Sequence, residues 1–362
     1  MRFFCIFFVL VFFTACGNSA VTVFNNIGDD EIHIGVVYPV ALRDRDTYLR
    51  QGIELAVEQI NAEGGVLGRS LRTVIRDDEN DAHIAMQIAN TMYEQGITAV
   101  VGHWSTNICY FVADVYQENR VVMITPAATG TNLFEYKSHY IFRMGSNHDI
   151  YAEAIARHMS EEGFSRAAIF HSDDEYGNDF ALNIERALSK ENIIVIDRIT
   201  NISPASIDSI MARWNAFDCD GVVVAALMPG IIEPIQLIRG ANRDIPIFGA
   251  DNFYRTNFSS YFEGYMENIF KAAFDFDSLC GNFHEKFRET YGHDPDIRAI
   301  SGYAAVRLIA DAMEAAGTTD STAIADFLSQ LENHPTVFGK LSYNEISHEF
   351  ENFNVGIIRL GD

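Results

Sequence analysis

The chain has 362 residues, of which 48% are hydrophobic, and its formal net charge at pH 7 is −24. This length exceeds that of a usual single domain, so two domains with separate cores are expected. The acidic balance argues against a nucleic-acid partner, because binding to phosphates requires an excess of lysine and arginine.

The first residues are typical of an exported protein. Met1-Arg2 precedes an apolar run over 3–13, and this run is too short to span a bilayer, which takes about 20 residues. The sequence predicts a signal peptide over 1–15, and Phe13-Thr14-Ala15-Cys16 is similar to a bacterial lipobox, although Phe13 departs from the usual leucine. We therefore expect Cys16 to be lipidated, with 16–30 as anchor and linker; the alternative is ordinary cleavage beside an incidental cysteine.

The other cysteines of the mature chain do not indicate a structural framework. Cys109, Cys219 and Cys280 are odd in number and widely spaced, which fits neither paired disulfides nor a metal site. We expect buried free thiols, no metal and no cofactor.

Short apolar runs alternate with helical patterns through the first part of the mature chain. Strands are predicted at 32–37, 71–76, 97–102 and 121–125, with helices around 53–60, 85–92 and 108–115. Thr106 or Asn107 is placed to cap the helix that contains 108–115. This alternation predicts a parallel sheet covered by helices.

The same rhythm restarts after Arg143. Strands are predicted at 167–171, 193–199, 221–226 and 245–250, with helices near 149–162, 178–191, 205–217 and 231–241. Later helices near 279–291, 300–316 and 323–331 return to complete the earlier lobes. We predict two doubly wound Rossmann-like α/β lobes joined by a hinge, with lobe one formed by 31–147 and 276–335, and lobe two by 148–275 and 336–362.

Two loops predict a ligand site. The strands before 103–107 and 126–132 each lead into a cluster of hydroxyls and small residues. Loops at the carboxyl ends of parallel strands are where open α/β sheets bind ligands. Thr106 and Thr129, with free N–H groups at a helix start, suit a carboxylate.

Four segments carry a family resemblance when taken in order. They are the run 52–68, Gly102-His103, the run 123–129 and Tyr176-Gly177. Together they resemble the leucine/isoleucine/valine-binding proteins, which are solute-binding subunits of branched-chain amino-acid ABC transporters. The resemblance covers nearly the whole mature chain and implies the type I periplasmic binding protein fold.

The resemblance also implies ligand contacts. Thr106, Ala127 and Thr129 would hold the α-carboxylate of an amino acid, while Asp251 would bind its ammonium and Tyr176 would line the cleft. Only a closed form would satisfy both charges, which couples binding to closure. The structural alternatives are that Thr106 is merely a helix cap and Asp251 a solvated loop acid.

Several positions depart from the leucine-binding pattern. Trp104, next to Ser105, replaces a smaller pocket residue, and with Tyr48 it would form a stacking wall. Leu227 stands where leucine-binding members have an aromatic residue. Arg298 falls near an apolar pocket position, where surface exposure is the conservative interpretation and a cleft position would favour a polar or acidic ligand.

Two further comparisons concern the first lobe. The cysteine pair of some relatives is replaced by Asn80 and Ser105. His103 precedes the loop cluster and is expected to be packed, with no role as a ligand or base.

These observations predict an extracytoplasmic, lipid-anchored solute-binding component of an ABC importer. It would bind an amino acid or close analogue, partner a permease and ATPase complex, touch the membrane only through its anchor, and catalyse nothing. The alternatives are a sensor of the same fold that feeds a receptor or regulator, and a binder of amides, urea or small carboxylates. An exported hydrolase is disfavoured, because the sequence holds no G-x-S-x-G, H-E-x-x-H or glycine-rich phosphate motif.

Overall fold

The computed structural model of the chain describes residues 30–134, 138–250, 253, 258–262, 266–274 and 282–360. The predicted signal peptide, Cys16, Asp251 and Cys280 lie outside these residues. Within the described ranges, no helix combines the length and apolar character that crossing a membrane requires.

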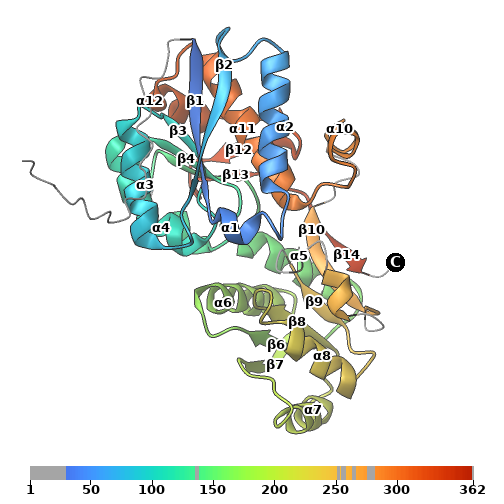
Figure 1. Cartoon of the computed structure of the whole chain (residues 1–362). Coiled ribbons are helices and arrows are strands. Elements are labelled where there is room, and N and C mark those ends of the chain that lie inside the picture. The colour runs from blue at the N-terminus through green and yellow to red at the C-terminus, as the bar shows by residue number, and fades with distance from the viewer. Residues whose placement is uncertain are drawn as a thin grey trace, which may run out of the picture.

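The first lobe is built on a parallel five-stranded sheet in the order β2-β1-β3-β4-β5 (Figure 1). Its strands are β1 (Glu31–Tyr38), β2 (Ser70–Asp77), β3 (Ala99–Gly102), β4 (Val122–Thr125) and β5 (Ile141–Arg143). Val36 and Val37 on β1 are both buried, and their side chains enter different cores. Because side chains alternate along a strand, this pattern requires helices on both faces of the sheet.

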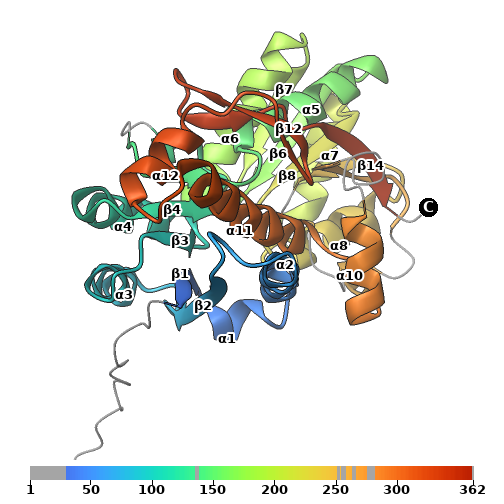
Figure 2. The ribbon, with the colours of Figure 1, turned by 90° about the horizontal axis from the view of Figure 1, so that it is seen from above.

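Helices cover both faces as this pattern requires (Figure 2). One face carries α2 (Leu49–Ala62), α11 (Ile297–Ala316) and α12 (Ser321–Leu328), and the other carries α3 (Ala82–Glu94) and α4 (Thr106–Asn119). The short α1 (Val40–Arg43) follows β1, and α10 (Phe283–Tyr291) packs near α2. The predicted return of the C-terminal helices to lobe one is observed for α11 and α12.

Helices α2 and α11 are in close contact, which fixes the start of α11 beside the loops of lobe one. A Cβ at Gly52 would lie 1.9 Å from the carbonyl oxygen of Ala299, so only glycine allows this approach. Asp296 caps α11 by accepting hydrogen bonds from the N–H of Ala299 at 2.8 Å and of Tyr48 at 3.0 Å. The first turn of α11 is thus held against α2.

The second lobe has a six-stranded sheet in the order β14-β10-β9-β8-β6-β7, parallel except for β14. Its strands are β6 (Arg166–His171), β7 (Ile194–Ile199), β8 (Gly221–Ala225), β9 (Ile247–Gly249), β10 (Ile269–Phe274) and β14 (Val355–Leu360). One face is covered by α5 (His148–Glu161) and α6 (Glu175–Lys190), the other by α7 (Ile207–Ala216) and α8 (Ile232–Ala241). The predicted fold, two doubly wound α/β lobes, is confirmed.

The C-terminal segment divides between the lobes, which corrects the predicted boundary at residue 336. The small sheet of β11 (His334–Thr336), β12 (Gly339–Asn344) and β13 (Glu349–Glu351) packs into the core of lobe one. Phe350 of β13 stacks on Phe142 of β5 at 5.7 Å between ring centroids. Only β14 joins lobe two, because its backbone completes the edge of the sheet at β10.

The chain therefore passes between the lobes repeatedly. It crosses between β5 and α5, again between β10 and α10, and last between β13 and β14. These connecting segments between the lobes are where a hinge would bend.

Candidate functional site

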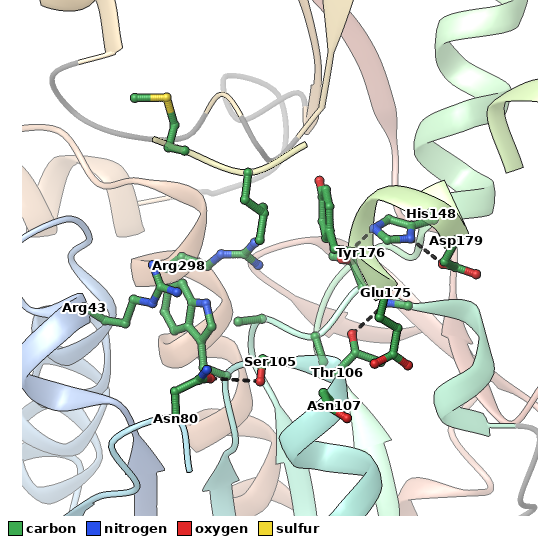
Figure 3. A pocket seen from close by; sticks show the side chains of 17 residues that line it. Arg43, Asn80, Ser105, Thr106, Asn107, His148, Glu175, Tyr176, Asp179 and Arg298 are labelled. Carbon is green, nitrogen blue, oxygen red and sulfur yellow. Dashed lines mark hydrogen bonds and ion pairs between the residues drawn. The ribbon is translucent and has the colours of Figure 1, made fainter. Parts of the chain in front are cut away.

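A cavity of about 190 Å³ lies between the lobes (Figure 3). Its lining in lobe one comes from Arg43, Asn80, Trp104, Ser105, Thr106, Asn107, Ala127, Ala128, Thr129, Gly130 and Arg298, and in lobe two from His148, Glu175, Tyr176, Asp179, Leu227 and Met228. The volume is below the roughly 300 to 1,000 Å³ of typical drug-sized pockets, so the cavity suits a small ligand. The structure brings together six of the predicted site residues: Trp104, Ser105, Thr106, Ala127, Thr129 and Tyr176.

The floor of the cavity is formed by the loops after β3 and β4. The N–H of Gly130 donates to Thr106 Oγ1 at 3.0 Å, which joins the two loops. Ser105, rather than Thr106 or Asn107, is the N-cap of α4, and its Oγ accepts from the N–H of Ile108 at 3.4 Å. Thr106 is thus the first helical residue, and its hydroxyl lies at the positive end of the helix.

Asn80 and Ser105 are in direct contact across neighbouring loops. Ser105 Oγ donates to Asn80 Oδ1 at 3.0 Å. The resemblance places a cysteine pair of some relatives at these positions. A hydrogen bond connects the same two loops here.

A buried network holds the loop after β4 from below. Thr125 Oγ1 donates to the carbonyl of His103 at 2.7 Å and accepts from the N–H of Ala128 at 3.1 Å. His103 is fully buried, with its ring nitrogens 2.7 Å from Asp78 and 3.1 Å from the Tyr116 hydroxyl. The prediction that His103 is packed is confirmed, and its role is to support the loop.

Arg143 fixes the same loop from its other side. Its Nη1 donates to the carbonyls of Ala128 at 3.1 Å and Gly130 at 2.8 Å, and its Nη2 pairs with Glu349 on β13. The second carboxylate oxygen of Glu349 accepts from Asn147 Nδ2 at 2.8 Å. Because Asn147 is the N-cap of α5, this network connects the floor of the cavity to the hinge.

His148, the first residue of α5, links the floor to lobe two. Its Nε2 lies 2.9 Å from Thr129 Oγ1, and its Nδ1 lies 2.5 Å from Asp179 Oδ2 on α6. Burial by itself raises the pKa of Asp179, but the hydrogen bonds and charge of His148, with the hydrogen bonds from Thr131, outweigh it and hold this pKa below its ordinary value. Asp179 is therefore an anion at neutral pH, and it accepts a hydrogen bond from His148 Nδ1.

Tyr176 contributes to the lobe-two wall, as predicted. Its ring meets the ring of His148 edge-on, with 4.8 Å between the ring centroids. The Phe180 ring stacks on the same His148 ring, with 4.7 Å between centroids. A Cβ at Gly177 would lie 2.2 Å from the carbonyl oxygen of Ser172, so glycine lets α6 begin close to the preceding loop. This contact brings Tyr176 to the cavity.

Trp104 lies in the cavity with two arginines beside it. The guanidinium carbon of Arg43 is 4.8 Å from the Trp104 ring centroid, and that of Arg298 is 5.4 Å from it. Arg298 is only 4% exposed, so the conservative expectation of a surface position is wrong. The reason is the close packing of α11 on α2, which places the first turn of α11 beside the loop after β4.

Tyr48 does not line the cavity, which corrects its predicted role in the stacking wall. It is the N-cap residue of α2, and its ring lies 4.0 Å from that of His293 and 6.3 Å from that of Phe287. Leu227 does line the cavity, next to Met228. Asp251, the predicted ammonium ligand, lies outside the described residues.

The two cysteines within the described ranges do not line the cavity. Cys109 and Cys219 are free thiols; burial raises the pKa of Cys109 to about 12 and that of half-buried Cys219 to about 11. Over the described ranges, His, Cys, Asp and Glu side chains form no group of three or more suited to holding a metal ion.

Sequence reasoning missed His148, Asp179, Arg43 and Arg143 as parts of the site. Of these, Asp179 had a usable signal: it lies three residues after Tyr176, so both fall on one side of α6, which begins at Glu175, earlier than the predicted start near 178. Arg43 and Arg143 carried no motif, because their roles arise from contacts with distant loops.

Comparison with known proteins agrees with this geometry. The family described as periplasmic binding protein matches residues 31–352. The chain belongs to the periplasmic binding protein family. Among curated members, it is 23% identical over 346 residues to the Leu/Ile/Val-binding protein homolog 1 of Brucella suis, covering 92% of this chain and 91% of that protein.

Other members of the family support the same grouping. The leucine-, isoleucine-, valine-, threonine- and alanine-binding protein of Pseudomonas aeruginosa is 24% identical over 332 residues, covering 90% of this chain and 88% of the relative. The ABC transporter substrate-binding protein of Desulfitobacterium hafniense, solved in complex with Leu, is 29% identical with a TM-score of 0.84, covering 92% and 98% of the two chains. The resemblance to leucine/isoleucine/valine-binding proteins is thereby confirmed for this periplasmic binding protein.

Proposed function

We propose that this chain is the extracytoplasmic solute-binding component of an ABC importer and that it binds an amino acid or close analogue between its lobes without catalysing a reaction. The observation that carries this proposal is the cavity itself. Its floor holds Thr106 and Thr129 at the ends of adjacent parallel strands, and its opposite wall comes from α6 of lobe two. The substrate-binding protein of D. hafniense shares this chain's fold over 92% of its length, and the leucine-, isoleucine-, valine-, threonine- and alanine-binding protein of P. aeruginosa aligns with 90% of it.

The floor is suited to a carboxylate. Thr106, Ala127 and Thr129 line one cavity, close to the start of α4. The Ala127 N–H donates to Thr125 Oγ1 at 3.4 Å, so the two threonine hydroxyls are the proposed donors. Hydrogen bonds from neutral donors to an anion are stronger than those between neutral groups, and the helix start adds favourable electrostatics. The α-carboxylate of the ligand would bind here.

His148 decides whether Thr129 can donate to that carboxylate. When both ring nitrogens carry protons, Nδ1 donates to Asp179 and Nε2 donates to Thr129 Oγ1, so the Thr129 hydroxyl proton remains for the ligand. A neutral ring protonated only on Nδ1 would instead take the Thr129 proton. Asp179 accepts from Nδ1 in both arrangements, so the proton on Nε2 is what distinguishes them.

The acidic side of the cavity suits the ligand ammonium. Glu175 and Asp179 both line it from the first turns of α6, and Asp251 is proposed to join them from the loop after β9. Because the two charged ends of the ligand bind different lobes, binding stabilises the closed arrangement. A closed, loaded protein is what an importer must recognise.

Attachment at the cell surface completes the proposal. A lipid on Cys16 would hold the lobes near a permease and ATPase complex through the linker 16–30. Metabolic labelling with a radioactive fatty acid tests this step: wild type should be labelled and Cys16→Ala should not. Label that persists in Cys16→Ala would place the lipid elsewhere.

The binding step is tested by calorimetry on protein unfolded and refolded to remove any bound ligand. Titration with the common amino acids, small carboxylates and amides should identify at least one ligand of micromolar affinity or better. Thr129→Val, which keeps the shape and removes the hydroxyl, should weaken binding about 10-fold or more. Thr91→Val, at an exposed helical threonine whose hydroxyl bonds only to Gln87, is the matched control. Absence of binding across the panel would refute the proposed function.

A further inference from the structure

Trp104 lies in the part of the cavity next to the proposed carboxylate site. It is the largest apolar side chain among the described residues that line the cavity, and it is 7% exposed. Trp104 stands two residues before Thr106, and Cα atoms two residues apart are separated by at most about 7.6 Å. A ligand whose carboxylate binds at Thr106 therefore has its side chain within reach of the indole ring.

Two arginines hold the Trp104 ring in place. Arg43 ends α1 and Arg298 is the second residue of α11, and both line the cavity (Figure 3). Their guanidinium carbons lie 4.8 and 5.4 Å from the ring centroid, where a cation is attracted to the π-electrons of an indole. Arg298 also donates from Nη1 to the carbonyl of Pro126 at 3.2 Å. The ring cannot swing aside without losing these contacts, so it is a firm boundary of the cavity.

Lobe two bounds the same cavity with apolar side chains. Leu227 and Met228 lie in the loop after β8, and both line the cavity. Met228 is 7% exposed, so its side chain is packed against the rest of the protein. In this arrangement of the lobes, an indole from lobe one and aliphatic groups from lobe two together limit the length of a ligand side chain.

The volume of the cavity sets the size of its occupant. An apolar cavity of about 150 Å³ binds benzene. Scaled from that case, the cavity of about 190 Å³ has room for roughly eight non-hydrogen atoms. Valine and threonine have this size, and leucine, methionine and phenylalanine exceed it.

Resting on the proposed function, we propose that Trp104 is a specificity-determining residue that restricts the ligand to amino acids with short side chains, no larger than those of valine or threonine. The carboxylate binds at Thr106 and Thr129, and the indole ring ends the space left for the side chain. A longer side chain would overfill the cavity and displace packed groups, which is unfavourable. This specificity differs from the Leu present in the solved D. hafniense relative.

The test compares amino acids of different length. Refolded protein is titrated by calorimetry with the common amino acids. At least one of alanine, serine, threonine and valine should bind about 10-fold or more tightly than leucine, methionine and phenylalanine. Tightest binding of any longer amino acid, or binding of carboxylates and amides alone, would overturn the inference and leave the proposed function standing. Failure of every amino acid, carboxylate and amide to bind would overturn both.

Substitution of Trp104 assigns the size limit to its ring. Trp104→Leu should raise the affinity for leucine and phenylalanine about 10-fold relative to that for the short ligand, because a smaller side chain leaves room for a longer ligand. Trp104→Phe should act in the same direction but less strongly, and it carries the test if thermal unfolding shows that Trp104→Leu does not fold. Phe217→Leu, at an exposed aromatic residue that does not line the cavity, should leave the ratio unchanged. A ratio that is also unchanged in the folded Trp104 variants would overturn the inference.

Tryptophan fluorescence gives a second readout of the contact. The chain has two tryptophans, and Trp214 is fully buried in the core of lobe two and does not line the cavity. Saturation of the wild type with the short ligand should change the emission, and this change should be lost in Trp104→Phe. Emission that stays constant when the wild type is saturated would show that the ligand does not meet Trp104, and would overturn the inference.

Discussion

Thr131 of lobe one donates its hydroxyl proton to Asp179 of lobe two, with 2.7 Å between the oxygen atoms. The N–H of Thr131 donates to the other carboxylate oxygen at 3.3 Å, and His148 Nδ1 contacts that same oxygen. One carboxylate thus joins the loop after β4, the first residue of α5 and the first turns of α6. These are the segments that must come together when the lobes close on a ligand.

Replacing Asp179 with asparagine is expected to weaken ligand binding about 10-fold. The variant keeps the shape but removes the carboxylate that accepts from His148 Nδ1, so the His148 ring is held less firmly against Thr129 on the floor of the cavity. Calorimetry measures the affinity, and small-angle scattering should show a more open ligand-free protein. Asp173→Asn, at an exposed acid on the loop before α6, should change neither quantity.

The stability contributed by Asp179 is expected to depend on pH. Its pKa is lower in the folded state than the ordinary value of 3.8, so folding favours the carboxylate. The contribution is complete above the unfolded-state pKa and is lost as pH falls through the folded-state pKa. Urea unfolding of wild type and Asp179→Asn should therefore differ near pH 6, and the difference should shrink below about pH 4. A difference that grows on acidification would contradict this.

Breaking the buried pair of Arg143 and Glu349 is expected to cost about 3 to 5 kcal/mol of unfolding free energy. Glu349→Leu leaves the buried guanidinium without its carboxylate, and urea unfolding measures the loss. The exposed pair of Lys190 and Glu153 is the control, and Lys190→Met should cost less than about 1 kcal/mol.

The double variant Arg143→Met with Glu349→Leu separates stability from function. An apolar pair of similar volume should recover much of the stability. Ligand affinity should stay reduced, because the carbonyls of Ala128 and Gly130 no longer receive hydrogen bonds from Arg143. Full recovery of affinity would show that Arg143 does not position the loop.

Gly52→Ala is expected to destabilise the chain by about 1 to 3 kcal/mol, because the added Cβ would meet the backbone carbonyl of Ala299. Gly240→Ala in α8 is the matched control: apart from its chain neighbours and the backbone of its own helix, no atom lies within 4 Å of its Cβ position, and alanine favours a helix. Gly240→Ala should be neutral or stabilising by up to about 1 kcal/mol. Equal effects in thermal unfolding would show that α2 and α11 can separate at no cost.

The alternation of parallel strands and helices was predictable because buried strands and amphipathic helices have different patterns of apolar residues in the sequence. The run 32–37 is apolar except for His33, and it forms a strand whose apolar side chains are buried on both faces. The edge elements were not predictable in this way. β14 and the sheet β11–β13 are short and partly polar, and their placement depends on which sheet edge or core they meet.

The candidate site likewise contains residues that local sequence predicts and residues that only tertiary contacts place. Loops that follow parallel strands must meet at one edge of a sheet, so Thr106 and Thr129 could be placed together from local pattern alone. His148 could not, because its ring is positioned by contacts with Thr129 and Asp179 on different lobes. Tyr48 was predicted to line the cleft, but its ring packs on His293 and does not line the cavity.

The sequence by itself determined the two α/β lobes, the family and the two lobe-one loops that line the cavity, because these follow from local periodicity and from motifs that are contiguous in the chain. Only the tertiary structure decided where Arg43 and Arg298 lie. They lie on α1 and α11, far apart in the sequence, yet both guanidinium groups approach the Trp104 ring. The close packing of α11 on α2 at Gly52 holds Arg298 there. The charge of the pocket arises from contacts between distant segments, which local sequence does not encode.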